Sequence, residues 1–517
     1  MSFTTFAFAL FLAAFYLLYF LLPSKIRWVV LIPANLIFYC AAGVKELPFM
    51  LAAAVLSYIA GRFLQRVQDR YAAEREKHRG TEAAAARKQL KQAKERRSRF
   101  ILIAVLIPVM GIWAFFKADR TGSFTAPFAI SYYTFIAVSY CADVFRGRHR
   151  CETNFLKFFA FLTFFPQMVE GPISRYETVG KAITEPHGFS FDRFGEGVVR
   201  AMWGYIKKMV LADRLWKIIA YVYGLADPTG PQVLMIVLLL PLQQFADFSG
   251  CMDIALGFAH AMGIDLQENF RQPIFSRSIE EVWRRWHITL GAFCRDYIFY
   301  PVSLLKPLAR ASKKLSVKHP KAGRLLPVLV SLTAVWTFMG LWHGFAWKYL
   351  IWGWMNLFFI AGGNIFKEQY AHLRTVFRVR QDSPAYSLFA IARTYLLFGF
   401  MELVSDGSSA GSALHFLRRM FSASGWHAGD TAGEAPVLVG TALQAGLGIP
   451  DLWIIAVFTA LCLAAEICKE RGKPPLARFS GLPALPRCLL DTAMLFCILM
   501  LALTASEAGT GFAYARF

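Results

Sequence analysis

The sequence has little charge for its length. Of its 517 residues only 17% are Asp, Glu, Lys or Arg, whereas 56% are hydrophobic and 15% are aromatic. Soluble proteins carry about a quarter charged residues, so this composition argues against a water-soluble enzyme. The 37 glycines and 23 prolines are ordinary for the length, which excludes a collagen-like or disordered chain.

Several common catalytic and metal-binding patterns are also missing. The sequence has no G-x-G-x-x-G, Walker or H-E-x-x-H pattern. Its nine cysteines form no C-x-x-C pair and lie mostly in apolar stretches, where cysteine behaves as a small hydrophobic residue. The pattern therefore supports neither a disulfide framework nor a zinc site. We expect no metal and no tightly bound cofactor.

Long apolar stretches, in contrast, recur along the whole chain. A helix needs about 20 mostly apolar residues to cross the hydrocarbon core of a membrane. We therefore predict an all-α, polytopic membrane protein with ten to twelve membrane segments, some of them re-entrant or tilted. The candidate segments lie near residues 5–22, 28–43, 46–61, 100–116, 127–143, 154–169, 231–247, 325–341, 346–363, 385–404, 452–468 and 486–505.

The distribution of Lys and Arg predicts the orientation in the membrane. Lys25 and Arg27 follow the first candidate span, and residues 62–99, after the third, form the most basic stretch of the chain. If residues 62–99 are cytoplasmic, counting backwards places Lys25 and Arg27 inside as well. The two signals agree, and they predict a multi-pass protein of the cell membrane with its N-terminus outside.

The net charge of +22 raises the question of nucleic-acid binding. Much of the excess lies in residues 62–99 and in 306–324, which hold seven Lys or Arg and no acid. Both read as membrane-flanking cytoplasmic segments that contact anionic lipid head groups, so we expect membrane lipid and no nucleic acid as a partner. Residues 70–97 predict a solvated charged helix that lies along the membrane, with a docking arm for a soluble partner as the alternative.

The segment 247–300 holds too many ionisable residues to face lipid. Such residues inside a membrane domain are costly and indicate function by default. Asp247 and Asp253 lie at the end of an apolar span, and Arg295 and Asp296 follow farther along the chain. On position alone these four read more simply as internal salt-bridge or capping partners than as chemical actors.

A helix is predicted to begin at Ile279. Ser278 to Glu281 has the pattern of a capping box, and Glu280–Arg284 and Glu281–Arg285 are two i,i+4 ion pairs on one face. Trp283, Trp286, His287 and Leu290 fall at i, i+3, i+4 and i+7 on a neighbouring face. His287 is therefore expected to leave the helix among aromatic rings, away from the ion pairs.

A second histidine lies in the sequence GLWHG at 340–344. If a helix continues through it, Trp336, Gly340, His343 and Trp347 share one face. Gly340 and Gly344 remove side chains beside His343 and allow a close approach by backbone or substrate. The ordinary pKa of histidine, near 6.5, suits a general base for a hydroxyl group. The alternative is structural, since a histidine among tryptophans such as Trp283, Trp286 and Trp342 is most often a packed bundle residue.

Four segments together resemble the membrane-bound O-acyltransferase family. They are DFSGCMD at 247–253, NFRQPIFSRSIEEVWRRWHITL at 269–290, CRDY at 294–297 and GLWHG at 340–344. FFPQMVEGPISRY at 164–176 and GSALHFLRRMF at 411–421 are similar to segments of its alginate O-acetyltransferase branch, to which the teichoic-acid D-alanyl-transfer protein is related. The resemblance covers residues 150–421, and the combination of W-R-R-W-H with a downstream G-x-W-H-G is specific.

The resemblance implies a ring of membrane helices around a central tunnel, with an activated acyl group presented from the cytoplasm and an acceptor hydroxyl on the outer side. It assigns catalysis to His343, with His287 as a second functional position. We expect His343 to deprotonate or orient the hydroxyl, and His287 to lie near the entrance for an acyl-CoA (acetyl-CoA) or phosphopantetheine thioester. The predicted substrate-binding residues are Trp283, Arg284, Arg285, Trp286, Arg295, Asp296, Trp342, Asp247 and Asp253.

This assignment divides the chain into four parts: N-terminal membrane helices (1–61), a basic cytoplasmic charged helix or loop (62–99), the acyltransferase-like core (100–421), and a polar loop with C-terminal membrane helices (422–517). No hydrolase-like domain is fused to the spans. We therefore expect a separate exported or periplasmic partner of the SGNH acetyltransferase or esterase type. A soluble acyl-carrier protein is a second expected partner.

The function that the sequence favours is O-acylation, most simply O-acetylation, of an extracellular polysaccharide or cell-wall polymer in a bacterial envelope. D-alanyl transfer from a carrier protein to teichoic acid is an alternative of the same class. A transporter or flippase for a lipid-linked glycan is an alternative of another class, although the absence of a visible internal repeat counts against it. A catalytically silent membrane scaffold is the third.

Overall fold

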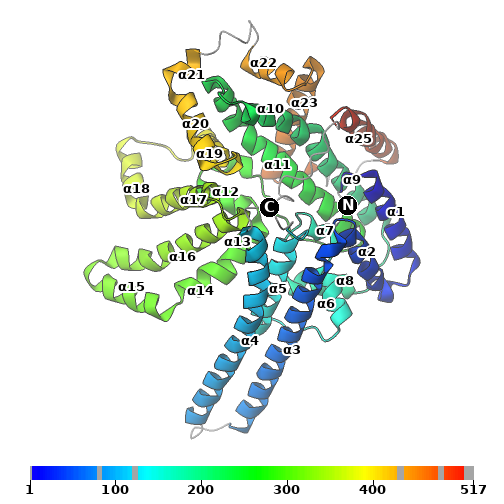
Figure 1. Ribbon diagram of the computed structural model, residues 1–517, viewed down its shortest axis with the longest axis vertical. Coiled ribbons are helices and arrows are strands. Elements are labelled where there is room, and N and C mark those ends of the chain that lie inside the picture. Colours follow the sequence, from blue (N-terminus) through cyan, green and yellow to red (C-terminus); the bar gives the residue numbers. More distant parts are fainter. Residues whose placement is uncertain (1–2, 79–83, 119–125, 428–435, 476–482, 506–517) are drawn as a thin grey trace. The chain divides into compact units, whose positions relative to one another are not determined.

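The computed structural model describes residues 3–78, 84–118, 126–427, 436–475 and 483–505. Within these ranges the regular structure is helical, and the one β-type pairing is an isolated antiparallel bridge between Phe270 and Trp286 (Figure 1). The predicted all-α class is therefore confirmed. Two compact units are present: unit 1 comprises Met1–Phe194 with Phe258–Gln267, and unit 2 comprises Gly195–Gly257 with Glu268–Phe517.

Helices make up most of the described residues. Those up to the start of unit 2 are α1 (Phe6–Leu21), α2 (Trp28–Cys40), α3 (Leu47–Lys77), α4 (Ala84–Ala118), α5 (Ile130–Arg146), α6 (Phe155–Leu162), α7 (Phe165–Met168), the π-helical η4 (Tyr176–Gly180), α8 (Lys181–Thr184) and α9 (Phe191–Tyr205). The next are the π-helical η5 (Ile206–Ala212), α10 (Asp213–Gly224), α11 (Gly230–Ala261), α12 (Ile279–Arg285), α13 (Ile288–Cys294), the π-helical η7 (Arg295–Phe299) and α14 (Tyr300–Ser303). The last are α15 (Lys306–Lys318), α16 (Pro320–His343), α17 (Trp347–Ile365), α18 (Lys367–Val376), α19 (Pro384–Asp406), α20 (Ala410–Phe421), α21 (Ala423–His427), α22 (Val437–Gln444), α23 (Ile449–Glu470) and α25 (Ala484–Ala505).

Six helices of the described residues are long and apolar enough to cross a membrane. They are α3, α4, α11, α16, α19 and α23. The pair α17 and α18, bent by 65°, would make a seventh span if it crosses the membrane as one unit. The protein is therefore a polytopic membrane protein, as predicted. Two further apolar helices are shorter, since α1 and α2 have only 16 and 13 residues.

The predicted segment 154–169 is not one helix. α6 ends at Leu162 and α7 begins only at Phe165, directly before Pro166. Asn35 of α2 compensates for the break, since its side-chain oxygen accepts from the Phe165 N–H at 2.9 Å and its amide donates to Thr163 at 3.1 Å. A hydropathy pattern does not detect such a break, because the residues on both sides of it are apolar.

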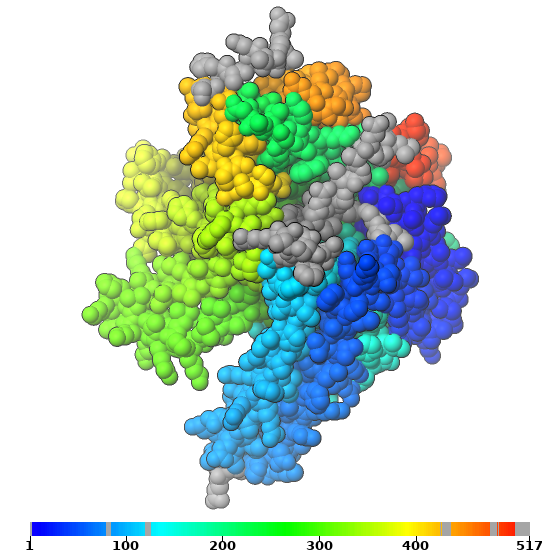
Figure 2. Space-filling view, in the orientation of Figure 1, coloured from blue at the N-terminus to red at the C-terminus, as the bar shows by residue number. Residues whose placement is uncertain are grey.

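In unit 1, α3 and α4 pack against each other (Figure 2). Each begins or ends as an apolar span and continues, within the same helix, into the charged stretch 70–97. The described residues of this stretch are therefore helical, as predicted, because Ala, Glu, Lys, Arg and Gln favour continuing a helix. Residues 79–83 of the stretch lie outside the described residues, as do residues 428–435 of the predicted polar loop.

In unit 2, glycines bring α9 and η5 close to α11. A Cβ added to Gly257 would lie 2.4 Å from the carbonyl oxygen of Gly197, and one added to Gly250 would lie 2.9 Å from that of Gly204. These backbone contacts leave no space for larger residues. They hold the basic residues of η5 beside the acidic residues of α11, which form part of the candidate site.

Candidate active site

The helix predicted at Ile279 is present as α12. Ser278 caps it by accepting from the Glu281 N–H at 3.2 Å, while the Glu281 carboxylate accepts from the Arg277 N–H at 2.8 Å. Glu280 pairs with Arg284, which is mostly exposed. Both predicted i,i+4 pairs are thus confirmed, because local spacing alone determines them.

Arg285 is the better buried of the two arginines of α12. It pairs with Glu281 at 2.7 Å and with Glu470, after the apolar part of α23, at 2.8 Å. Burial alone would lower the pKa of Arg285, but its hydrogen bond to Glu470 and the charge of Glu281 raise that pKa above its ordinary value. Arg285 therefore ties α12 to the end of α23 as a permanent cation.

The predicted helical face through His287 is wrong, because α12 ends at Arg285. Trp286 is extended and His287 has φ +47°, in the left-handed region. The chain is held there by the segment that precedes α12: Arg271 N–H donates to the Arg285 carbonyl at 2.8 Å, and Ile288 N–H donates to the Asn269 carbonyl at 3.0 Å. A non-glycine residue in this conformation is strained, and such strain concentrates at functional sites.

His287 is held by Asn269, which contributes a side-chain oxygen. That oxygen accepts from the backbone N–H of Thr289 at 2.9 Å, which fixes the orientation of the Asn269 amide, and it lies 3.3 Å from Nδ1 of His287. Nδ1 must therefore be the protonated nitrogen, and Nε2 must have the free lone pair. Nε2 is buried and has no hydrogen-bond partner among the described residues. Burial lowers the pKa of His287 to about 3, so the imidazole is neutral at physiological pH.

His343 is the last residue of α16, so the helix does not continue through it to Trp347. Gly344 ends the helix at φ +149°, and a Cβ added to Gly340 would lie 2.7 Å from the carbonyl oxygen of Tyr349. Gly340 thus allows α17 to approach α16 directly beside His343. Trp347 does not share this face, since it begins α17 and is 64% exposed, so that part of the prediction is wrong.

Aromatic rings surround both histidines. The His343 ring lies 4.6 Å from that of Trp342, 4.8 Å from that of Trp352 and 5.8 Å from that of Tyr349. The ring of His287 lies 5.7 Å from that of Trp342 and 4.8 Å from that of Phe248. Both histidines therefore contact Trp342, although they are 56 residues apart in the sequence.

Trp283 and Trp286 form the packing behind these rings. The indole N–H of Trp283 donates to Asn356 at 2.7 Å, and its ring packs edge-on against Trp336 and Trp352. Trp286 is buried against Phe270 and Phe398. Their contacts agree with the structural reading of these tryptophans.

Asp247 and Asp253 are buried in ion pairs with successive lysines of η5. Lys208 lies 2.6 Å from Asp247 and 2.8 Å from Asp213, and Lys207 lies 2.6 Å from Asp253. Burial opposes the charge of Lys208, but the carboxylates of Asp247 and Asp213 hold its pKa above the ordinary value. These contacts agree with the salt-bridge reading of the two aspartates.

Arg295 and Asp296 pair with each other on η7 at 3.0 Å, and the Arg295 side chain is mostly exposed. The structure thus brings Trp342 and the two histidines together and leaves this pair on the neighbouring π-helix. Among the described residues, no group of three or more His, Cys, Asp and Glu side chains gathers as metal ligands would.

Two cavities of unit 2 that are lined by cationic side chains lie next to this site. The larger, about 620 Å³, is lined by Arg271, Arg284 and Arg285 together with Gln272 and Lys469. The smaller, about 30 Å³, shares Gln272 and Lys469 with it and is also lined by Met252 and Phe270. The Asn269 amide lies 3.3 Å from the sulfur of Met252, so the smaller cavity borders the group that holds His287.

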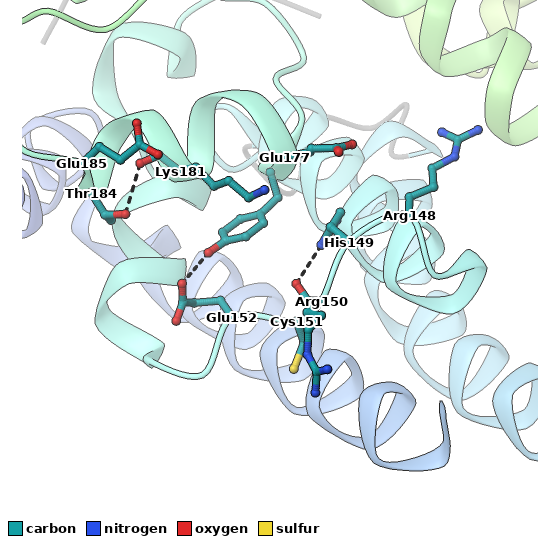
Figure 3. A pocket seen from close by; sticks show the side chains of 10 residues that line it. Arg148, His149, Arg150, Cys151, Glu152, Glu177, Lys181, Thr184 and Glu185 are labelled. Carbon is teal, nitrogen blue, oxygen red and sulfur yellow. Dashed lines mark hydrogen bonds between the residues drawn. The ribbon is translucent and has the colours of Figure 1, made fainter. Parts of the chain in front are cut away.

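A third cavity, of about 430 Å³, belongs to unit 1 (Figure 3). It is lined by the loop 148–152 and by side chains of η4 and α8, and no predicted site residue is among them. Inside it the Tyr176 hydroxyl donates to Glu152, and Nδ1 of His149 lies 3.0 Å from the Arg150 carbonyl oxygen. Its arginines are bound elsewhere, Arg148 to Asp143 and Arg150 to Asp69.

Sequence reasoning missed two residues of this site. Asn269 stands in the quoted segment 269–290, but only tertiary structure shows that it faces His287. Glu402 had a readable signal, because it is an acid within the apolar segment 385–404. Its indole partner, Trp352, contacts His343.

Comparison with known proteins agrees with the site. Residues 144–401 match the family described as MBOAT, membrane-bound O-acyltransferase family. The chain is 30% identical over 363 residues to the "Probable alginate O-acetylase AlgI" of Azotobacter vinelandii, which covers 66% of this chain and 64% of that protein. It is 25% identical over 368 residues to the "Peptidoglycan O-acetyltransferase" of Helicobacter pylori, covering 63% and 62%. It is 26% identical over 246 residues to the "Teichoic acid D-alanyltransferase" of Bacillus subtilis, covering 46% and 59%.

The matched region spans less than two thirds of each of these relatives. The family match, residues 144–401, contains both histidine motifs, α12 and the part of α19 that ends at Met401. With the helical membrane fold, the paired histidines and these matches in agreement, the chain belongs to the membrane-bound O-acyltransferase family.

Proposed function

We propose that this protein is an O-acyltransferase that moves an acyl group, specifically acetyl, from a thioester donor to a hydroxyl group of an extracellular polysaccharide or cell-wall polymer. The observation that carries the proposal is the pair of buried histidines, His287 and His343, whose rings lie 5.7 Å and 4.6 Å from that of Trp342. The names of the acetyl-transferring relatives favour acetyl as the acyl group.

In the proposed reaction, His343 accepts the proton of the acceptor hydroxyl group while the oxygen of that hydroxyl attacks the thioester carbonyl carbon. A carbon–oxygen bond forms, the carbon–sulfur bond breaks, and the thiolate that leaves takes up the proton from His343. The surrounding rings exclude water, which would otherwise hydrolyse the thioester. His287 offers the lone pair of Nε2 to an amide N–H of the bound acyl-CoA or phosphopantetheine donor.

The donor would enter through the larger cavity of unit 2. Its cations, Arg271, Arg284, Arg285 and Lys469, suit the phosphate groups of an acyl-CoA or a phosphopantetheine carrier, although neighbouring glutamates already pair with Arg284, Arg285 and Lys469. Arg285 and Lys469 would lie on the cytoplasmic side in the orientation that the basic segments predict, with the N-terminus outside a bacterial inner or plasma membrane.

The acceptor would meet the acyl group from the outer side of the membrane. An exported or periplasmic SGNH-type partner would complete transfer onto the polymer, and a soluble acyl-carrier protein would serve as donor if free acetyl-CoA does not. Anionic lipid would contact the basic segment 306–324, which contains seven Lys or Arg residues and no Asp or Glu.

D-alanyl transfer is the second candidate, because relatives named teichoic acid D-alanyltransferase match the chain. They are 26% identical to it, whereas the relatives named alginate O-acetylase are 30% to 35% identical. This difference favours acetyl. A flippase would not need paired histidines in an aromatic enclosure.

The test uses the purified full chain in nanodiscs with radiolabelled acetyl-CoA and, in parallel, a D-alanyl carrier protein. His343→Ala should reduce thioester cleavage about 1000-fold, because a general base contributes about 10²–10⁴-fold. His372→Ala is the matched control, since His372 is exposed on α18. Cleavage of the D-alanyl thioester alone would select the second candidate, and equal turnover by wild type and His343→Ala would refute the role of His343.

A further inference from the structure

The carboxyl group of Glu402 is buried in unit 2 and takes no part in the reaction as written above. It lies in α19, which is apolar enough to span the membrane, and it is 3% exposed. An acidic group at such a position is costly and indicates a function. Among the described residues, no Lys, Arg or His forms an ion pair with it; its partners are neutral hydrogen-bond donors.

Three donors from three helices converge on this carboxyl group. The indole N–H of Trp352 donates to Oε1 at 2.9 Å, and the Ser405 hydroxyl lies 3.2 Å from Oε2. The side-chain amide of Gln244, on α11, also hydrogen-bonds to it. A carboxyl group offers two acceptor oxygens for these donors, whereas a glutamine offers one.

The close packing of α19 on α11 makes this convergence possible. A Cβ added to Gly399, one turn before Glu402, would lie 2.1 Å from the carbonyl oxygen of Val237. The two helix backbones therefore touch at Gly399. Tyr395 ties the same helices together by donating to the Leu238 carbonyl at 2.7 Å.

The partner that matters for chemistry is Trp352. Its indole is 1% exposed, and its ring meets that of His343 edge-on, with centroids 4.8 Å apart and planes at 70°. Since the indole has a single N–H, the bond to Glu402 determines how the ring is turned. The orientation of the ring in turn defines one wall of the space that the imidazole of His343 occupies.

We propose that Glu402 is a positioning residue for acyl transfer: by accepting from Trp352 it holds the indole edge-on against His343 and thereby fixes the imidazole that takes the acceptor proton. This inference rests on the proposed function of His343. A displacement of about 1 Å at a reacting group costs about 100-fold in rate, so support at this distance matters.

The kinetic test compares Glu402→Leu with Glu402→Gln, which keeps an acceptor oxygen for Trp352. With acetyl-CoA in nanodiscs, Glu402→Leu should lower kcat about 10- to 100-fold with little change in KM, and Glu402→Gln should stay within about threefold of wild type. In a Trp352→Phe background, which keeps a ring but removes the N–H, Glu402→Leu should cause no further loss. An equal loss in the Gln and Leu variants, or a full additional loss in the Trp352→Phe background, would overturn the proposal.

A second measurement separates this proposal from the proposed function. In protein labelled with ¹⁵N at the tryptophan indoles, the Trp352 resonance is the one that disappears in Trp352→Phe. It should shift in Glu402→Leu and stay in place in Glu402→Gln, and thermal unfolding should confirm that each variant is folded. A wild type without acyl transfer would count against the proposed function alone, whereas an unshifted Trp352 resonance in Glu402→Leu would refute the role of Glu402.

Discussion

His287 and His343 contact the same indole but are held in different ways. His287 stands in a strained turn whose backbone and imidazole are fixed by hydrogen bonds to Asn269. His343 ends a helix of 24 residues and is enclosed by rings, with glycine providing the close packing. A polar partner fixes the tautomer as well as the position. Aromatic rings fix the position of an imidazole by packing against it.

The largest effect should come from disrupting the close contact between α16 and α17 beside His343. In Gly340→Val the new side chain meets the backbone of Tyr349 and Leu350, so α17 must move; we expect a loss of about 3 kcal/mol or more in unfolding free energy. Gly362→Ala, in the same α17 but with open space around its Cβ, should be neutral or stabilise by up to about 1 kcal/mol. Thermal unfolding in detergent measures both. Similar changes for the two variants would show that the contact at Gly340 is not what holds this pair of helices.

The next largest effect should come from the polar support of His287. Asn269→Leu removes the acceptor for His287 Nδ1–H and Thr289 N–H, which costs about 1–3 kcal/mol in stability, and turnover should fall by a factor of about 10 or more. Asn269→Asp restores an acceptor and adds a negative charge, which raises the pKa of His287. Turnover in Asn269→Asp should therefore recover as the pH rises from 5 to 8, while Asn269→Leu stays low throughout. Equal activity of Asn269→Leu and wild type would show that His287 needs no such support.

The smallest of the three effects concerns pH and stability. Because burial lowers the pKa of His287 to about 3, the unfolded chain binds a proton at this residue below its ordinary pKa of about 6.5 while the folded protein does not. His287 therefore makes the protein less stable as the pH falls from 6.5 towards 3, by up to about 1.4 kcal/mol per unit. Between pH 7 and pH 5 the wild type should lose about 2 kcal/mol more than His287→Gln. The exposed His372→Gln should lose as much as wild type, and a wild-type loss no greater than that of His287→Gln would contradict the assignment.

The parts of this site that the sequence predicted are those fixed by local spacing. Ser278 caps α12 and its two ion pairs form because residues three and four apart meet on any helix. The glycines around His343 likewise predicted the close approach of another backbone segment, which is found between Gly340 and Tyr349. The turn at His287 was not predictable in this way, since it depends on Asn269, which is 18 residues earlier in the chain.

The break between α6 and α7 could not be predicted for a related physical reason. Hydropathy reports how apolar a segment is, and it does not show where a helix ends. α6 and α7 are apolar on both sides of a break that Asn35 of α2 stabilises, and the break can be seen only when α2 is in place. The contact between both histidines and Trp342 depends in the same way on how α16 packs, which no periodicity encodes.

The α3–α4 pair has a mechanical consequence. α3 is one helix of 31 residues, apolar at one end and charged at the other, and at 1.5 Å per residue it is about 46 Å long. A rod of this kind acts as a lever: a tilt of about 10° within the membrane would sweep its far end through about 8 Å. Conversely, any load that clamps the charged end of α3 also fixes the tilt of its apolar segment, because the two belong to one uninterrupted helix.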